Sequence, residues 1–345
     1  MRTTYEVDPS VHPDREREQL ERRLRQLRLM QRSLEKFEEV WSRINGVQSK
    51  LGGQFKIRTP FAYQAEPAPE DSSDRRLPAR KYRPPATRLV SPRGAALRLY
   101  LTALAEAQTR AKAGTRPINH RPLLPPDNET VAWVDLVVSP MTSSGAGRTR
   151  LSARDKKLRQ LQSALARLAS DEVQLVDLPY SENRRRGYEG FQLLDERGTR
   201  PLGEPMPYKV PTDKEDFFNL PTNLITRGWI HLLTDTEISL LLMVACKRGS
   251  IPAADGFVAI PGEIRLMHYG IGRDKFSDAA NMLDRLGLLA VMADPARNKD
   301  STVQSFHKEG TTVRLHRLLL RTDGFINSGS VELVEELEHQ LARSR

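Results

Sequence analysis

Residues 261–292, PGEIRLMHYGIGRDKFSDAANMLDRLGLLAVM, decide the fold that we predict for this chain. Pro261 suits the first turn of a short helix, because a backbone N–H would have no helical partner there. Gly270 and Gly272 supply the tight turn that ends this helix, and a second helix is predicted over 273–286. The apolar residues of the second helix recur every three or four positions: Phe276, Ala280, Leu283 and Leu286.

The elements on either side of this helix pair complete one predicted unit. Thr234 and Glu237 form a capping box that opens an earlier helix, which Gly249 ends. Two strands, at 288–292 and 311–320, are predicted on either side of a polar loop. The order of the unit is therefore three helices followed by a hairpin.

The first half of the chain repeats that order. Three helices and then two strands are predicted, over 91–113, 129–138, 152–168, 173–178 and 188–194. The valines of the second segment also favour a strand, and we expect a short helix there. Ser152 and Asp155 form the capping box of the third helix. Both third helices begin with Arg-Asp-Lys, at 154–156 and at 273–275, which is a modest sign of duplication.

Other patterns predict the segments outside these two units. Apolar residues recur at steps of three or four from Leu20 to Ile44, so residues 1–52 are predicted to hold a long amphipathic helix that packs on the rest of the chain or dimerises. Prolines interrupt residues 53–90, which are predicted to be a disordered or extended linker. Residues 330–345 are predicted to form a final acidic helix.

Residues 217–320 resemble a winged-helix domain, through the glycine turn and the Gly-Leu-Leu exit into a hairpin. The approach FFNLP at 217–221, with Gly228 and Trp229, is similar to the entry of winged-helix domains in plasmid replication initiators and in DnaD-type primosome proteins. Those initiators also contain tandem winged helices. The resemblance implies a mainly α fold with small β-hairpins (α+β), containing winged-helix domains at 91–200 and 211–322.

The charge of the chain indicates a polyanionic partner. There are 54 Lys and Arg residues against 44 Asp and Glu residues, a net charge of +10. Seven basic residues between 148 and 167 stand against Asp155 alone, whereas basic and acidic residues balance in the helix at 273–285 and in the loop after it. We therefore expect the first unit to contact DNA more strongly than the second. The predicted DNA-binding residues are Arg148, Arg150, Arg154, Lys156, Lys157, Arg159, Arg167, Arg184, Arg185, Arg186, Arg273, Lys275, Asn281, Arg285, Arg297 and Lys299.

The sequence contains no recognisable catalytic or cofactor site. Its seven histidines lack metal-ligand spacing, and no Gly-Lys-Ser or Gly-Lys-Thr follows the glycines at 145–147. Cys246, the only cysteine, excludes an internal disulfide. There is no secretion signal and no apolar run long enough to cross a bilayer. We expect a cytoplasmic protein that is not an enzyme and uses no metal or cofactor.

These observations predict a duplex DNA-binding protein, used in plasmid-type replication initiation or in transcription control. Double-stranded DNA is the main expected partner. A second copy of the chain, through the N-terminal helix or the second winged helix, and replication or transcription proteins are further candidates. Two alternatives stay open. One is a nucleoprotein scaffold in which the N-terminal helix and the second winged helix bind proteins, and the other is an RNA-binding protein.

Overall fold

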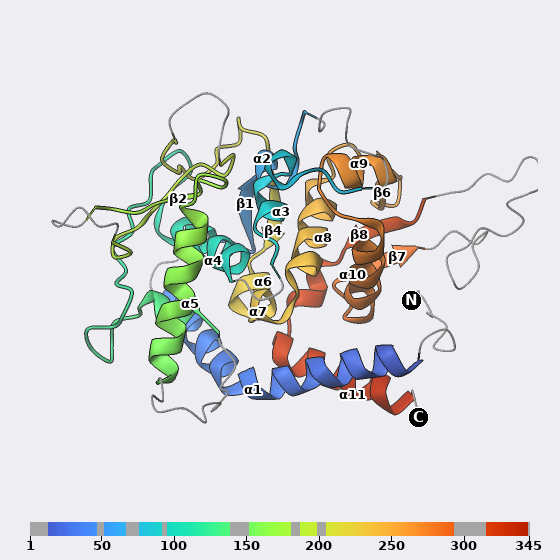
Figure 1. Cartoon of the computed structure of the whole chain (residues 1–345), viewed down its shortest axis with the longest axis horizontal. Helices are drawn as coiled ribbons and strands as arrows, with labels where there is room; N and C mark the ends of the chain where they lie inside the picture. Colours follow the sequence, from blue (N-terminus) through green and yellow to red (C-terminus); the bar gives the residue numbers. More distant parts are fainter. Residues whose placement is uncertain are drawn as a thin grey trace, which may run out of the picture.

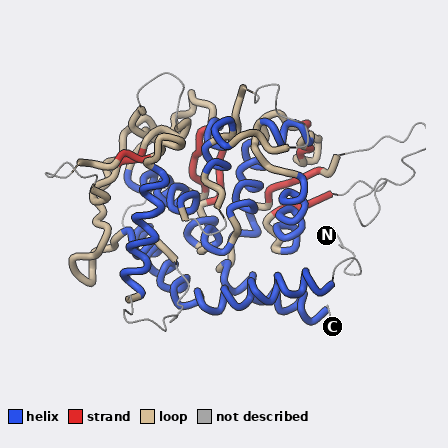
Figure 2. Tube along the Cα trace, viewed as in Figure 1, coloured by secondary structure: helices blue, strands red, loops and turns tan. Residues whose placement is uncertain are grey.

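The computed structural model describes residues 13–46, 52–66, 76–91, 95–138, 152–180, 187–198, 205–292 and 315–343. About half of these residues are helical, and their strands form three small antiparallel sheets (Figure 2). The described part of the chain therefore confirms the predicted mixture of helices and small β-sheets.

The N-terminal and C-terminal helices lie side by side along one edge of the molecule (Figure 1). They are α1 (Pro13–Gly46) and α11 (Gly329–Arg343), and both helices were predicted. The apolar stripe of α1 is buried within the chain, against α11, α6 and η2. Its most buried members are Leu27, Leu34, Phe37 and Trp41. Packing is thus the role of α1 that the structure shows, and the apolar face on which the dimerising role depended is already covered.

The prediction of a disordered linker at 53–90 is wrong for the described part of that segment. Four short elements occur there: β1 (Gln54–Arg58), α2 (Thr59–Ala62), the 3-10 helix η1 (Arg80–Tyr82) and α3 (Pro85–Arg88). Phe55, Ile57 and Phe61 are fully buried. Pro60 and Pro85 stand in the first turn of a helix, where proline is tolerated, so these prolines start helices and do not break them.

The first half has the predicted order of elements, with shorter bounds. The elements are α4 (Ala96–Arg110), the 3-10 helix η2 (Trp133–Leu136), α5 (Ala153–Leu168), β2 (Val176–Asp177) and β3 (Gln192–Leu193). The capping box of α5 forms as predicted, with Asp155 N donating to Ser152 Oγ at 3.1 Å. The expected short helix at 129–138 is only one 3-10 turn, since its valines favour extended backbone.

The second half also follows the predicted order, with additions before and within it. Its elements are β4 (Phe217–Pro221), α6 (Asn223–Thr226), α7 (Trp229–Leu232), α8 (Asp235–Cys246), β5 (Ile251–Pro252), β6 (Val258–Ala259), α9 (Gly262–Met267), α10 (Arg273–Arg285), β7 (Leu289–Met292), β8 (Arg317–Leu320) and the 3-10 helix η3 (Thr322–Phe325). The four-stranded sheet has the order β5-β6-β8-β7. The pair β5 and β6, between α8 and α9, was not predicted.

The two halves share a single hydrophobic core. Buried side chains from α1, β1, α4, α8 and β7 belong to one continuous cluster. Residues 238–244 of α8 are all buried, which is typical of a central helix that is covered on every side. Strand β1 also pairs along its whole length with β4, from Gln54 opposite Pro221 to Arg58 opposite Phe217.

Replacing a buried leucine of α1 tests the packing of this helix. Leu34 is fully buried, whereas Leu29 on the same helix is 43% exposed. We expect Leu34→Ala to lower the free energy of unfolding by about 2 to 5 kcal/mol, since it leaves a cavity. Leu29→Ala should change it by less than about 0.5 kcal/mol. Urea unfolding measures both, and equal effects would contradict the packing of α1 on its own chain.

His231 makes the stability depend on pH. Its side chain is buried on α7, with the ring edge-on to Phe37 at 4.5 Å between centroids. Burial lowers the pKa of His231 to about 3, and the nearby cations Arg98 and Lys157 contribute. The histidine is therefore neutral in the folded protein, while the unfolded chain binds a proton below its ordinary pKa of 6.5. Stability that is present above pH 6.5 is lost as the pH falls towards 3.

The variant His231→Met removes this titration. Between about pH 7.5 and pH 5, wild type should lose about 2 kcal/mol of unfolding free energy relative to the variant. Comparing the two proteins by urea unfolding at each pH cancels the contributions of all other groups. A difference that stays constant between the two pH values would show that His231 is not held neutral.

Candidate nucleic-acid interface

The turn between α9 and α10 is held in place by residues between Tyr63 and Thr87, which precede the first half of the chain. Gly270 has a φ of +69°, and a Cβ at this position would lie 3.1 Å from Arg83 Cγ and 2.8 Å from Thr87 Oγ1. Glycine is therefore required both for the backbone conformation and for the close approach of α3. The ring of His268 stacks on Tyr63, with 4.9 Å between centroids. The turn that the sequence predicted thus packs closely against Tyr63, Arg83 and Thr87.

The basic residues of α10 separate into two groups along the helix. Arg273 and Lys275, in the first turn, are exposed, with Asp274 exposed between them. Arg285, in the last turn, donates from Nη1 to Gln340 of α11 at 3.0 Å. Asn281 is half-buried. Of the predicted α10 residues, Arg273 and Lys275 are the ones that the structure leaves most open to a partner.

The basic residues of α5 point to opposite sides of the helix. Arg154 and Lys157 continue the three-and-four spacing of the buried Leu161, and Arg154 donates to the Pro125 carbonyl at 3.0 Å. Burial lowers the pKa of Lys157, against the attraction of Asp135. Since Lys157 faces the protein, the structure gives no support to its predicted contact with DNA.

The remaining basic residues of α5 share its outer face. By helical spacing Lys156, Arg159 and Arg167 lie away from the buried stripe; Arg159 is exposed, whereas Lys156 and Arg167 are half-buried. Arg167 forms an ion pair with Glu172 at 2.8 Å. The charge count over 148–167 therefore overestimates what α5 displays, because a count along the chain ignores the helical period. The predicted residues Arg148, Arg150, Arg184, Arg185, Arg186, Arg297 and Lys299 lie outside the described residues.

Sequence reasoning missed four arginines near these helices: Arg80, Arg83, Arg88 and Arg265. The first three belong to the sequence RKYRPPATR at 80–88, within the supposed linker. The fourth lies in α9, with its guanidinium 4.5 Å from the centre of the Phe276 ring. Burial lowers the pKa of Arg265, and neighbouring Arg273 adds to the effect. The high density of basic residues at 80–88 could have indicated a basic surface. The prolines in the same segment led instead to the prediction of a disordered linker.

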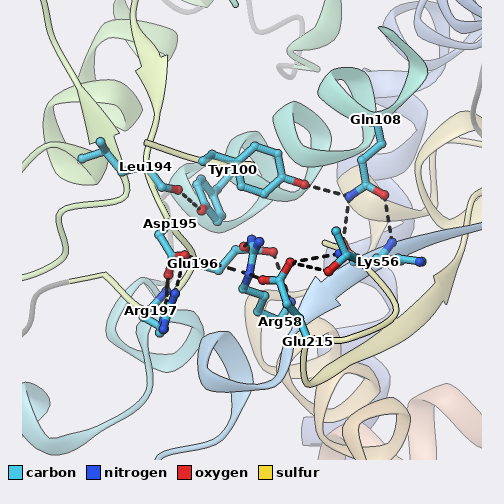
Figure 3. A network of polar contacts seen from close by, with 11 residues as sticks. Lys56, Arg58, Tyr100, Gln108, Leu194, Asp195, Glu196, Arg197 and Glu215 are labelled. Carbon is cyan, nitrogen blue, oxygen red and sulfur yellow. Dashed lines mark hydrogen bonds and ion pairs between the residues drawn. The ribbon is translucent and has the colours of Figure 1, made fainter. Parts of the chain in front are cut away.

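A buried ion network joins β1 to both halves (Figure 3). The Arg58 guanidinium pairs with Glu196 through Nη1 and with Glu215 through Nε, the latter at 2.6 Å. The backbone N–H of Arg58 also donates to Glu196 Oε1 at 3.1 Å. Burial raises the pKa of Glu196 to about 7, although Arg58 opposes the shift. Because its members satisfy one another inside the protein, we interpret this network as structural.

The described residues contain no group of three or more His, Cys, Asp or Glu side chains that could hold a metal ion. Within the same ranges, no helix is long and apolar enough to cross a membrane. No protein-family model, curated protein or solved structure matches the chain. The geometry of the basic surfaces is therefore the basis of the functional proposal.

Removing Arg58 tests the ion network. We expect Arg58→Met to lower the free energy of unfolding by about 3 to 5 kcal/mol, because buried carboxyl groups lose their counter-charge. Adding Glu196→Gln should restore part of this loss. Arg197→Gln is the matched control, since Arg197 contacts Asp195 of the same network with a side chain that is 41% exposed. The control should cost at most about 1 kcal/mol. Equal losses in both single variants, measured by urea unfolding, would contradict a central role for Arg58.

Proposed function

We propose that the chain binds duplex DNA through two winged-helix units, in plasmid-type replication initiation or in transcription control. In winged-helix proteins the second helix of the helix-turn-helix enters the major groove, and its N-terminal residues contact base edges. A hairpin follows that helix and reaches the neighbouring DNA backbone or the minor groove of the DNA. The proposal rests on the second unit, where these parts are most completely described.

The observation that carries the proposal is the sequence of elements around α10. Helices α9 and α10 are joined by a glycine turn, and the antiparallel pair β7 and β8 follows α10. Strand β6, which precedes α9, pairs with β8, so that the three strands have the order β6-β8-β7. Arg273 and Lys275 stand at the exposed beginning of α10, which is the end of a recognition helix that approaches the bases.

The first unit supports the proposal through α5. This helix precedes the hairpin of β2 and β3, and its outer face carries Lys156, Arg159 and Arg167. The sequence between β2 and β3 includes Arg184 to Arg186, and arginines of this kind can neutralise phosphates or enter a narrow minor groove. Two helices with exposed basic residues, each followed by a hairpin, favour a duplex over a single strand.

Substitution at the start of α10 tests the proposal. Wild type should bind a labelled duplex of about 30 base pairs with an affinity that falls steeply between about 50 and 200 mM salt. Arg273→Gln with Lys275→Gln should weaken binding and flatten the slope of log affinity against log salt by about 1.8, or roughly 0.9 per lost contact. Fluorescence anisotropy measures both quantities.

A control of equal charge distinguishes contact from general electrostatics. Arg22→Gln with Arg25→Gln removes two charges from the exposed side of α1, which lies along the bottom of the molecule in Figure 1, whereas α9, which leads into the start of α10, lies at the top. This variant should bind DNA nearly as wild type does. Equal weakening in both variants would contradict a specific role for α10, and tighter binding to structured RNA than to duplex would favour the RNA-binding alternative.

A further inference from the structure

Four arginines meet between the two halves of the molecule. We call Arg80, Arg83, Arg88 and Arg167 the arginine cluster. Arg80 Nε donates to the Arg88 carbonyl at 2.7 Å, and Arg167 Nη2 donates to the same carbonyl at 3.3 Å. Arg83 Nε donates to the Pro78 carbonyl at 2.8 Å. Backbone carbonyls thus bring the guanidinium groups of η1, α3 and α5 together.

The cluster has too little negative charge of its own. Among the described residues, Arg167 is the one member that forms an ion pair with a carboxylate, that of Glu172. Burial lowers the pKa of Arg80, and the nearby Arg167 lowers it further. Burial likewise lowers the pKa of Arg83, with Arg80 contributing. Four cations beside one acid repel one another, and a bound anion would relieve this repulsion.

The cluster also retains donors that face no protein acceptor. Arg83 uses Nε for its carbonyl contact, and its two Nη atoms have no hydrogen-bond partner in the described part of the chain. The side chain of Arg80 is exposed, and the neighbouring Lys81 is exposed as well. A guanidinium presents its N–H groups as a planar fork that matches two oxygens of a phosphate. The open donors therefore favour a phosphate over a single carboxylate.

The position of the cluster links it to both units. Arg167 lies in the last turn of α5, and Arg83 lies against Gly270 in the turn before α10. In Figure 1, α3 lies between β2, which follows α5, and α9, which precedes α10. A nucleic-acid backbone that runs from one unit to the other would therefore pass over the cluster.

We propose that the arginine cluster is a phosphate-binding site that holds the duplex DNA backbone between the two helical units. This inference rests on the proposed function, because it assigns the phosphates to DNA. Arg80, Arg83 and Arg167 contact the phosphate oxygens, while buried Arg88 holds Arg80 and Arg167 in position through its backbone carbonyl. Neutralising these phosphates releases counterions and adds to the salt dependence of binding.

The test compares three double variants in the full-length protein. Arg80→Gln with Arg83→Gln removes two charges, and Arg80→Lys with Arg83→Lys keeps both. The third variant is the control on α1, Arg22→Gln with Arg25→Gln. Anisotropy with a labelled duplex of about 30 base pairs, between about 50 and 200 mM salt, gives the affinity and the salt slope. Circular dichroism and thermal unfolding show that each variant is folded.

The glutamine variant should bind about fivefold or more weakly and lose about 1.8 from the salt slope. The lysine variant should keep the slope, because its two charges still release counterions, and should lose less affinity than the glutamine variant, since lysine binds phosphate as a point charge without the planar fork. A glutamine variant that binds as wild type does, while Arg273→Gln with Lys275→Gln weakens binding, would overturn the cluster but keep the proposed function. Equal losses in the glutamine and lysine variants would assign the arginines a structural role and overturn the phosphate site. If wild type binds no duplex, both proposals fail.

Discussion

The buried guanidinium of Arg58 sets the relative position of three parts of the chain. A cation at 5% exposure is stable only if carboxylates surround it. Those carboxylates come from Glu196, at the end of the first half, and from Glu215, at the start of the second. Since Arg58 ends β1, and β1 pairs with β4, the requirement for counter-charge and the backbone pairing fix the same junction. Helix α5 belongs to the first half and α10 to the second, so the position of one helix relative to the other depends on that junction.

Local signals in the sequence predicted the helices well. The capping boxes of α5 and α8 and the glycine turn before α10 all involve residues within a few positions of one another. Strand β1 has no such signal, because its partner β4 lies about 160 residues further along the chain. For the same reason, the ion pairs of Arg58 were not predictable from local patterns. The prolines at 53–90 favour a disordered segment by composition, yet two of them, Pro60 and Pro85, stand in the first turn of a helix.

The candidate site was predicted less completely than the fold. A count of charges along the chain identified α5, but Lys157 lies on its inner side, and only the three-dimensional packing shows that. The arginine cluster illustrates the opposite error, because residues 80–88 become a surface between two units only when α3 packs against the α9–α10 turn. The predicted division into two domains and a linker gave no reason to expect that basic residues of the linker would lie between the two halves.

The pairing of α1 with α11 has a consequence for how the protein folds during its synthesis. The side chains of Arg28 and Glu338 are in contact at 3.0 Å although they are 310 residues apart. At about 5 to 20 residues per second, a ribosome takes roughly 15 to 60 s to make the intervening chain. The leucines of α1 emerge before α11 and remain without that helix as cover for that time. A chaperone that binds exposed apolar helices can therefore act on α1 during that interval, which ends when α11 has left the ribosome and packs against α1.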